Sequence, residues 1–256
     1  FFVILPIYLI FTIIDLSIFV GMTFRTGKEE QTIVVAGTLT RYAEDISPLL
    51  KVLIAENVNK LKLDEPVDVK SIKIYYTLHP RDPFVSPFRD EMKNTMMRYI
   101  ICSHNMNILG KSQMLSITLP KYQMKNQKKV EFEGTKYEGK LWRYWMTQET
   151  NANFKRDITN REGEVKLRDN GVLLYPSAPW PASYHHTALL RPWNYNLFAI
   201  WNVLKFPVTQ VPMGLKDGLP VGIQVVAAPY QDHLCIAVAR ELERAFGGYV
   251  PPFETS

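Results

Sequence analysis

Cysteine is scarce in this chain, whose 256 residues contain only two, Cys102 and Cys235. Neither lies in a C-x-x-C pair, and two cysteines cannot form the disulfide framework of a small secreted domain. Sequons of the form N-x-[ST] are absent as well, so no residue marks the chain as secreted or lumenal. We therefore expect reduced, buried thiols in a protein that faces the cytosol.

Local catalytic and metal-binding motifs are also missing. The sequence has no G-x-S-x-G, H-E-x-x-H or G-x-G-x-x-G motif and no Gly/Ser-rich nucleophile loop. The one histidine pair, His185-His186, is adjacent in the chain, and adjacent side chains of an extended segment point to opposite faces and chelate one metal poorly. Ser177 and Ser183 have no base nearby in the sequence. We predict no metal, no cofactor and no catalytic residue among these residues.

Charge is not concentrated on one stretch of the chain. Lysine and arginine number 30 against 25 aspartates and glutamates, which gives a net charge of +5. The densest basic run, residues 121–129, lacks the repeated aromatic residues on which nucleic-acid bases stack. The run is typical of a solvated surface loop, and we predict no nucleic-acid partner.

One long apolar run is present, over residues 1–22, interrupted by three residues: Pro6, Asp15 and Gly21. About 20 apolar residues are enough for a helix to cross the hydrocarbon core of a bilayer. A carboxylate in mid-bilayer costs about 2.5 to 3.5 kcal/mol, so Asp15 opposes this interpretation. We predict a membrane helix in residues 1–24. A buried helix of a soluble core, or an incorrectly joined reading frame, is the alternative.

The rest of the chain, residues 25–256, is predicted as one domain on the cytosolic side of a membrane. Arg25 and Lys28 follow the apolar run directly, and positive charge beside a membrane helix favours the cytosolic face. Residues 148–168 are polar and weakly periodic, which indicates a weak internal boundary.

Periodicity and turn residues predict an α/β fold. Apolar residues spaced by three and four predict a helix over residues 40–55; alternatively, Ser47 caps it and Pro48 is its first residue. A second helix is predicted over residues 88–100, and a third over residues 194–204. Short apolar or alternating runs predict four strands, over residues 71–76, 171–176, 207–212 and 220–227.

Two features of the C-terminal region carry the most specific local predictions. Asp217-Gly218 is typical of a hairpin turn, because both residues tolerate a positive φ. A final helix is predicted to begin with Asp232 as its cap and to end at Gly247-Gly248. Its inner face is predicted to consist of four residues: Leu234, Val238, Leu242 and Ala245.

Several stretches are similar to sequences of a known family. Residues 25–53 centre on RYAED, and residues 61–64 and 71–76 match more weakly. Residues 169–250 contain, in order, NGVLLYPSAPWPASYHH, LLRPWNYNLFAIWNVLKFPVTQVPMGL, GLPVGIQVVAAPYQDHLCIAVARELE and FGGYVPP. On these residues the chain resembles the amidase-signature family, and in particular its fatty-acid amide hydrolase branch. The resemblance implies part of a mixed sheet with flanking helices, incomplete because the chain matches only the C-terminal half.

The resemblance also implies a reaction. The family hydrolyses carboxamides and some esters, with a serine nucleophile activated through a second serine and a lysine. Those groups belong to segments that precede the position matched by Arg25, so none is assigned here. Losing nucleophile and base together removes about six powers of ten in rate, and we predict that this chain alone is inactive. The alternative is a membrane-anchored, non-catalytic relative that binds lipids or protein partners.

Three residues are predicted to line a substrate channel: Pro176, Ser177 and Trp180. They follow a predicted strand end, where α/β proteins place ligands. The expected partners are a lipid-like amide substrate, a membrane and a second copy of the chain.

Overall fold

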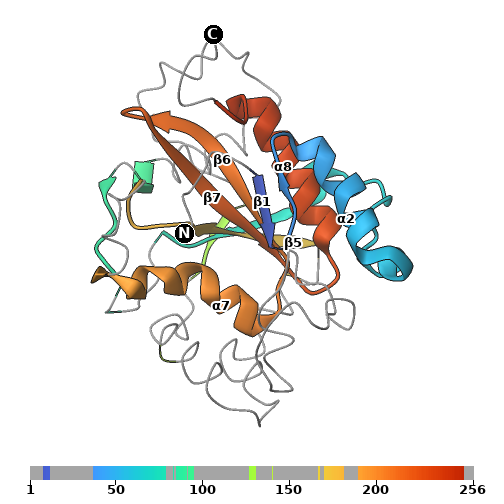
Figure 1. Ribbon diagram of the computed structural model, residues 1–256, viewed down its shortest axis with the longest axis horizontal. Helices are drawn as coiled ribbons and strands as arrows, with labels where there is room; N and C mark the ends of the chain where they lie inside the picture. The colour runs from blue at the N-terminus through green and yellow to red at the C-terminus, as the bar shows by residue number, and fades with distance from the viewer. Residues whose placement is uncertain are drawn as a thin grey trace.

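A mixed sheet organises the chain (Figure 1), whose structure is a computed structural model. It describes residues 8–11, 37–78, 83, 85–90, 92–94, 127–130, 140, 167, 170–181 and 190–250. The strand order in the 7-stranded sheet is β2-β1-β6-β7-β5-β3-β4. The strands are β1 (Tyr8–Phe11), β2 (Leu39–Thr40), β3 (Lys73–Tyr76), β4 (Gln127–Lys129), β5 (Gly171–Pro176), β6 (Val208–Lys216) and β7 (Leu219–Ala227).

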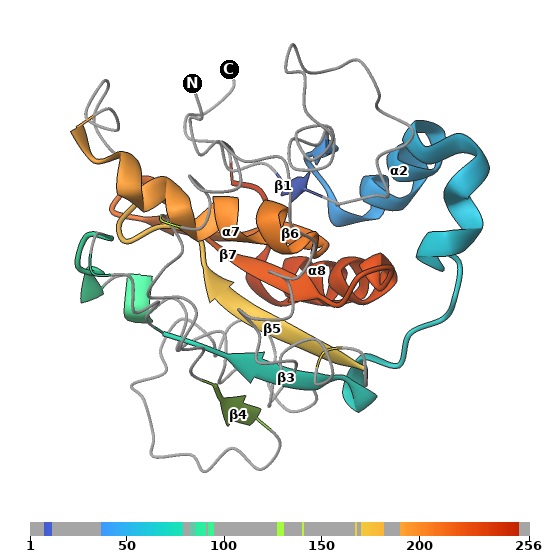
Figure 2. The same ribbon diagram turned by 90° about the horizontal axis from the view of Figure 1, so that it is seen from below.

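Parallel and antiparallel pairs divide the sheet into two parts. Strand β3 pairs in parallel with β4 and β5, and Figure 2 shows these three strands side by side. The pairs β5–β7, β7–β6, β6–β1 and β1–β2 are antiparallel. The predicted α/β class and mixed sheet are therefore confirmed.

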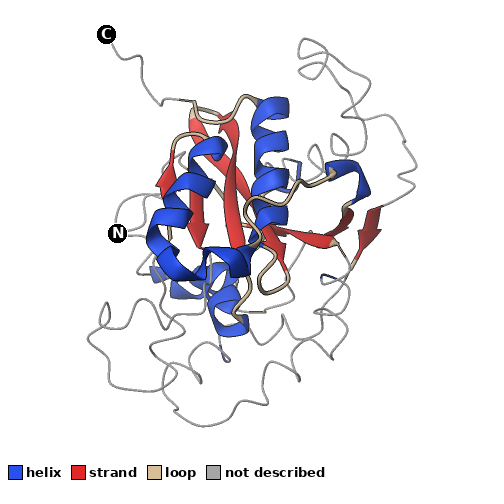
Figure 3. Ribbon diagram, turned by 90° about the vertical axis from the view of Figure 1, so that its right-hand side faces the viewer, coloured by secondary structure: helices blue, strands red, loops and turns tan. Residues whose placement is uncertain are grey.

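Helices cover both faces of this sheet. On one face lie α2 (Ile46–Ile54) and α8 (Asp232–Phe246), seen in front of the strands in Figure 3. On the other face lies α7 (Asn196–Leu204), below the sheet in Figure 1. Each face has its own buried apolar cluster, one including Leu50 and Leu242, the other Leu197 and Trp201. A buried side chain of this size contributes roughly 1.5 to 3 kcal/mol.

Four short 3-10 helices lie next to the α-helices or, in the case of η4, directly before β3. They are η2 (Ala43–Asp45), η3 (Ala55–Leu61), η4 (Val69–Ser71) and η8 (Pro192–Tyr195). The helix predicted over residues 40–55 is thus three successive elements. Pro48 lies in the first turn of α2, where backbone N–H groups have no partner within the helix, so its missing donor costs little.

The hairpin predicted from Asp217-Gly218 is confirmed. Strand β6 ends at Lys216 and β7 begins at Leu219, with φ values of 53° and 75° at the two turn residues between them. The register between these strands shifts between Pro212 and Leu215. Gly214, with a φ of 90°, supplies the backbone conformation that this bulge requires.

Helix α8 matches its predicted position but not its predicted cap. Gln231 occupies the cap position, and Asp232 is the first helical residue, with its carboxylate buried rather than bonded to the helix end. The prediction that Asp232 caps the helix is therefore wrong, because its side chain turns inward. At the other end Gly247 has a φ of 87° and donates to Glu243, as expected of a glycine terminator.

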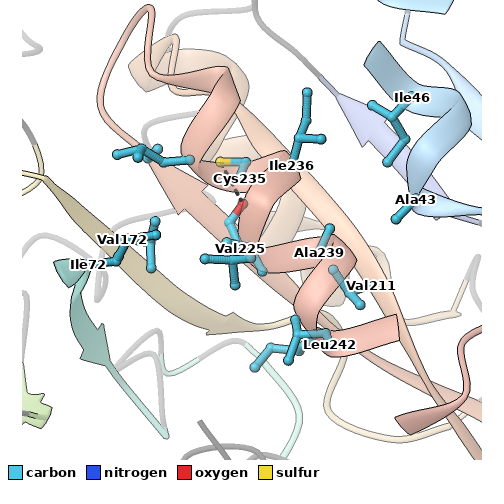
Figure 4. Close-up of a cluster of buried hydrophobic side chains, with 14 of the residues drawn as sticks. Ala43, Ile46, Ile72, Val172, Val211, Val225, Cys235, Ile236, Ala239 and Leu242 are labelled. Atoms are coloured by element: carbon cyan, nitrogen blue, oxygen red, sulfur yellow. Dashed lines mark hydrogen bonds between the residues drawn. The ribbon is translucent and has the colours of Figure 1, made fainter. Parts of the chain in front are cut away.

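The apolar cluster beneath α8 is shown in Figure 4. Cys235 lies within it, and its thiol donates to the carbonyl of Val225 at 3.4 Å and to that of Pro207 at 3.6 Å. The expectation of a reduced, buried thiol is confirmed for Cys235. Of the predicted inner face of α8, three residues are buried: Leu234, Val238 and Leu242.

The N-terminal apolar run contributes a strand to the sheet. Tyr8–Phe11 is extended and pairs with both β2 and β6, so at these four residues the structure differs from the expected helix. In the described ranges, no helix is both long and apolar enough to cross a membrane. The rest of residues 1–24, and residues 148–168 apart from the buried Leu167, lie outside the described residues.

Candidate functional site

The C-terminal end of β5 gathers polar side chains from three strands. Ser177 follows the strand directly, and its side chain is 3% exposed. Its hydroxyl donates to Oε1 of Gln210 on β6 at 2.6 Å. Strand β7 lies between β5 and β6 in the sheet, so this hydrogen bond bridges two strands that do not pair with each other.

A glycine makes this bridge possible. A side chain at Gly222 on β7 would place its Cβ 2.3 Å from Nε2 of Gln210 and 2.7 Å from the carbonyl oxygen of Val211. Both distances are well inside van der Waals contact. The carboxamide of Gln210 therefore lies directly over Gly222 on its way to Ser177, and only a residue without a side chain leaves that path open.

A second glutamine fixes the strand end beneath this bridge. Gln224 is 2% exposed, and its Nε2 donates to the carbonyls of Pro176 and Leu197, both at 3.0 Å. These two acceptors belong to the last residue of β5 and to the first turn of α7. The side-chain amide of Gln224 therefore links β7 to β5 and to α7. Without it, the two buried carbonyl groups would lose this hydrogen-bond donor.

Trp180 lies in the loop that follows β5. Its ring lies 5.4 Å from the guanidinium carbon of Arg191, a cation–π distance. Arg191 also donates to the hydroxyl of Ser86 at 3.2 Å, and the backbone N–H of Ser86 donates to Oδ1 of Asn194 at 2.9 Å. Segments far apart in the sequence are therefore held around the loop that follows β5.

Aromatic rings form the apolar floor on the same face of the sheet. Tyr175 and Trp201 meet edge to face with centroids 4.7 Å apart, and Trp201 stacks on Phe206 at 6.4 Å. All three rings are buried. Such ring pairs stabilise the fold by about 0.5 to 1.5 kcal/mol in addition to the effect of the apolar area that they bury. These rings belong to the buried apolar cluster on the α7 face of the sheet. We call Ser177, Trp180, Arg191, Gln210 and Gln224 the strand-end cluster.

The strand-end cluster contains no group that could activate its serine as a nucleophile. The hydroxyl of Ser177 donates to a carboxamide, which has no basic lone pair to accept a proton and so cannot activate the serine. No group of three or more His, Cys, Asp or Glu side chains that could hold a metal ion occurs in the described ranges.

Three titratable groups with shifted pKa values lie in the first turns of α8, on the other face of the sheet; Asp232 and Cys235 are buried and His233 is half-buried. Burial raises the pKa of Asp232 to about 7. Burial also raises the pKa of the Cys235 thiol well above its usual value, and nearby Asp232 adds to that effect. Burial lowers the pKa of His233. A thiol that resists ionisation is a poor nucleophile, so Cys235 is structural.

Each of the three residues predicted to line the channel contacts a side chain that the sequence did not predict as part of the site. Ser177 meets Gln210, the carbonyl of Pro176 meets Gln224, and Trp180 meets Arg191. Gln210 and Gln224 are each a polar residue in a mostly apolar predicted strand. This pattern could have identified them as candidates, because a polar residue in a buried strand needs a hydrogen-bond partner. Ser183 and the histidine pair at 185–186 lie outside the described residues.

The relationship to known proteins is decided by a family model described as Amidase, which matches residues 22–236. The chain belongs to the amidase family. Human fatty-acid amide hydrolase 2 is 32% identical over 87% of this chain, and fatty-acid amide hydrolase 2-B of Danio rerio is 32% identical over 85%. The match covers 50% and 49% of those proteins, so the chain spans about half the length of the curated relatives it matches.

A solved structure has a similar fold. The superposed protein is a component of the glutamyl-tRNA(Gln) amidotransferase of Thermotoga maritima, and the TM-score is 0.52 at 17% identity. The similarity covers 81% of this chain and 52% of that one. The predicted resemblance to the amidase-signature family is confirmed, and the partial coverage agrees with the expectation of an incomplete fold.

Proposed function

We propose that this chain is the substrate-lining part of an amidase that hydrolyses fatty-acid amides. The observation that carries the proposal is its 32% identity, over 87% of its residues, to a protein named fatty-acid amide hydrolase 2. The strand-end cluster is the part of the chain in which the residues predicted to line a substrate channel lie.

Cleavage of the amide bond is assigned to groups outside the strand-end cluster. The family resemblance implies a serine nucleophile, a second serine and a lysine in a Gly/Ser-rich segment, and these 256 residues contain no such segment. In this proposal the strand-end cluster binds and orients the ligand, and the chain by itself does not hydrolyse it. A fluorophosphonate, which labels activated serines, is expected to leave the purified chain unlabelled.

A chimera tests the assignment. In human fatty-acid amide hydrolase 2, the half matched by this chain is replaced by the chain, and hydrolysis of oleamide is measured with and without fluorophosphonate. The proposal expects hydrolysis by the chimera that the fluorophosphonate blocks, and none by the chain alone. A chimera that folds, shown by a cooperative thermal transition, and is labelled by fluorophosphonate but leaves oleamide intact would refute it.

A non-catalytic lipid-binding relative is the second candidate. The observation in its favour is that Ser177, the serine of the strand-end cluster, is paired with an amide instead of a base. This candidate expects the chain to bind fatty amides and to melt cooperatively alone, and expects the chimera to lack activity. The chimera therefore separates the two candidates.

Membrane association is proposed on the apolar composition of residues 1–24. Part of this run, Tyr8–Phe11, already pairs within the sheet. Co-sedimentation of the chain with phosphatidylcholine vesicles tests the proposal, and a chain that stays wholly in the supernatant contradicts it.

A further inference from the structure

The start of strand β5 is joined to β3 through the side chain of Asn170. Nδ2 of Asn170 donates to the carbonyl oxygen of Ser71 at 3.2 Å and to the hydroxyl oxygen of Ser71 at 3.0 Å. The backbone carbonyl of Asn170 accepts a hydrogen bond from the N–H of Lys73 at 2.9 Å. Ser71 ends η4 and Lys73 begins β3, so one asparagine holds the start of β3 against the start of β5.

The neighbouring contacts determine which end of the carboxamide faces Ser71. The Ser71 hydroxyl donates to the carbonyl of Asp68 at 2.8 Å, so its lone pairs are left to accept from Asn170. With oxygen and nitrogen exchanged, the amide oxygen of Asn170 would face the carbonyl oxygen of Ser71, and two acceptors repel each other. The nitrogen of the carboxamide is therefore the atom that makes both contacts.

The residue that follows makes the same carboxamide chemically reactive. Asn170 is followed by Gly171, and this is the only Asn-Gly step in the sequence. Glycine has no side chain to shield its backbone nitrogen, so that nitrogen can attack the side-chain carbonyl carbon of the preceding asparagine. Asn170 is half-buried and Ser71 is exposed, so water reaches the junction between the two residues.

We propose that Asn170 is a deamidation site and that its deamidation unlinks β3 from β5. In this reaction the backbone nitrogen of Gly171 loses its proton and bonds to Cγ of Asn170. The bond from Cγ to Nδ2 breaks, and ammonia leaves with that proton. Water then opens the cyclic imide at one of its two carbonyls, which gives aspartate or isoaspartate. The inference is independent of the substrate of the chain.

The atom that leaves is the atom that forms the link. Loss of Nδ2 removes both donors to Ser71, and the new carboxylate places a negative charge opposite the carbonyl oxygen of Ser71. The isoaspartate product also adds a methylene group to the main chain, which displaces the carbonyl that Lys73 contacts. The chemical change and the release of β3 are therefore one event.

The folded structure controls the rate of this reaction. Gly171 is buried and Ser71 holds the carboxamide of Asn170, so the attack requires both hydrogen bonds to break and the start of β5 to open locally. Removing one of these hydrogen bonds is therefore expected to speed deamidation while the rest of the chain stays folded.

Incubation of the purified 256-residue chain in mildly alkaline buffer tests the proposal. Deamidation is followed by mass spectrometry of peptides, and isoaspartate is detected with protein isoaspartyl methyltransferase, because isoaspartate is diagnostic of the cyclic imide. The wild type is compared with Ser71→Ala, which removes the hydroxyl acceptor, and with Ser71→Thr, which keeps it. Lys70→Ala, which truncates the neighbouring exposed side chain of η4, is the matched control. Asn59, exposed in η3, is the internal reference site.

Aspartate and isoaspartate are expected to accumulate at Asn170 in the folded wild type, and faster in the same chain unfolded in urea. Ser71→Ala is expected to raise the rate at Asn170 in the folded chain about fivefold to tenfold, the effect of one lost hydrogen bond. The rate at Asn59 is expected to stay unchanged. Ser71→Thr and Lys70→Ala are expected to keep the wild-type rate.

The structural consequence is measured on Asn170→Asp, which carries the carboxylate of the product and keeps Ser71. Asn170→Gly lacks the carboxamide without adding charge and tolerates the φ of 55° at this position, so it is the control. Both variants are expected to have a lower denaturation midpoint than the wild type, and Asn170→Asp the lower of the two. This comparison decides the structural part of the proposal even if Ser71→Ala fails to fold.

Three outcomes overturn the inference. If no isoaspartate forms at Asn170 in the folded wild type or in a folded Ser71→Ala variant, Asn170 is not a deamidation site of the folded chain. If Ser71→Ala is folded and reacts at the wild-type rate, Ser71 does not protect the carboxamide. If Asn170→Asp is as stable as the wild type, the carboxylate does not unlink β3 from β5.

Discussion

Glu243 of α8 accepts a hydrogen bond at 3.0 Å from the backbone N–H of Ala43, which lies 200 residues earlier in the chain. Ala43 is the first residue of η2, whose preceding residue, Tyr42, provides no side-chain cap. The carboxylate of Glu243 therefore caps the start of the η2–α2 segment from another helix. It joins two elements that pack on the same face of the sheet.

Replacing this remote cap is predicted to destabilise the fold. Glu243→Ala is expected to lower the free energy of unfolding by about 1 to 2 kcal/mol, because it removes a charged acceptor from a helix start. Chemical denaturation measures the change. Glu241→Ala on the same helix is the control, since Glu241 pairs with the exposed Arg244 and is expected to cost under about 1 kcal/mol. Equal effects of the two variants would contradict the capping role.

Gly222 is predicted to tolerate no side chain. Gly222→Ala is expected to cost about 1 to 3 kcal/mol, because its Cβ meets both the Gln210 amide and the backbone of Val211. Combining it with Gln210→Ala is expected to recover only part of that loss, since the carbonyl of Val211 stays in place. Denaturation of the two single variants and the double variant gives the coupling. Strict additivity would show that Gln210 does not cross Gly222.

Asp232 is predicted to make stability fall as pH rises. Its pKa is raised by burial from 3.8 to about 7, so the folded chain holds a proton that the unfolded chain has released. The stabilising contribution is therefore complete below about pH 4 and is lost progressively as pH rises to about 7. A shift of this size corresponds to roughly 4 kcal/mol.

Asp232→Asn isolates this effect. The variant carries no titratable proton at this position, so its stability is expected to change less between about pH 4 and 7 than that of the wild type. Denaturation midpoints across the pH range provide the measurement. If the wild type and Asp232→Asn show the same change of stability with pH, the carboxyl is not buried in its protonated form.

Local elements of this fold follow from the sequence because their signals are local. The apolar run at 171–176, bounded by Gly171 and Pro176, forms β5 with the predicted bounds. Asp217-Gly218 forms the predicted turn, because its φ requirement depends only on those two residues. Helix α8 follows from the spacing of its apolar residues and from Gly247.

Relationships between distant segments could not be predicted in the same way. Tyr8–Phe11 is as apolar as a membrane helix, and only its neighbours β2 and β6 make it a strand. Asp232 has the composition of a helix cap, yet tertiary packing turns it inward. Ser177 and Gln210 meet across a third strand, and no local pattern records the glycine at 222 that permits this contact.

The strand-end cluster is proposed as the amide-binding site of this amidase-family chain, and photolabelling tests that proposal most directly. An oleamide analogue with a diazirine beside the amide is bound to the chain and irradiated, and the labelled peptides are identified by mass spectrometry. Label is predicted within residues 176–181 or around Arg191 and Gln210, reduced by excess oleamide. Label confined to the α2 and α8 face, with none at the strand-end cluster, would contradict the proposal.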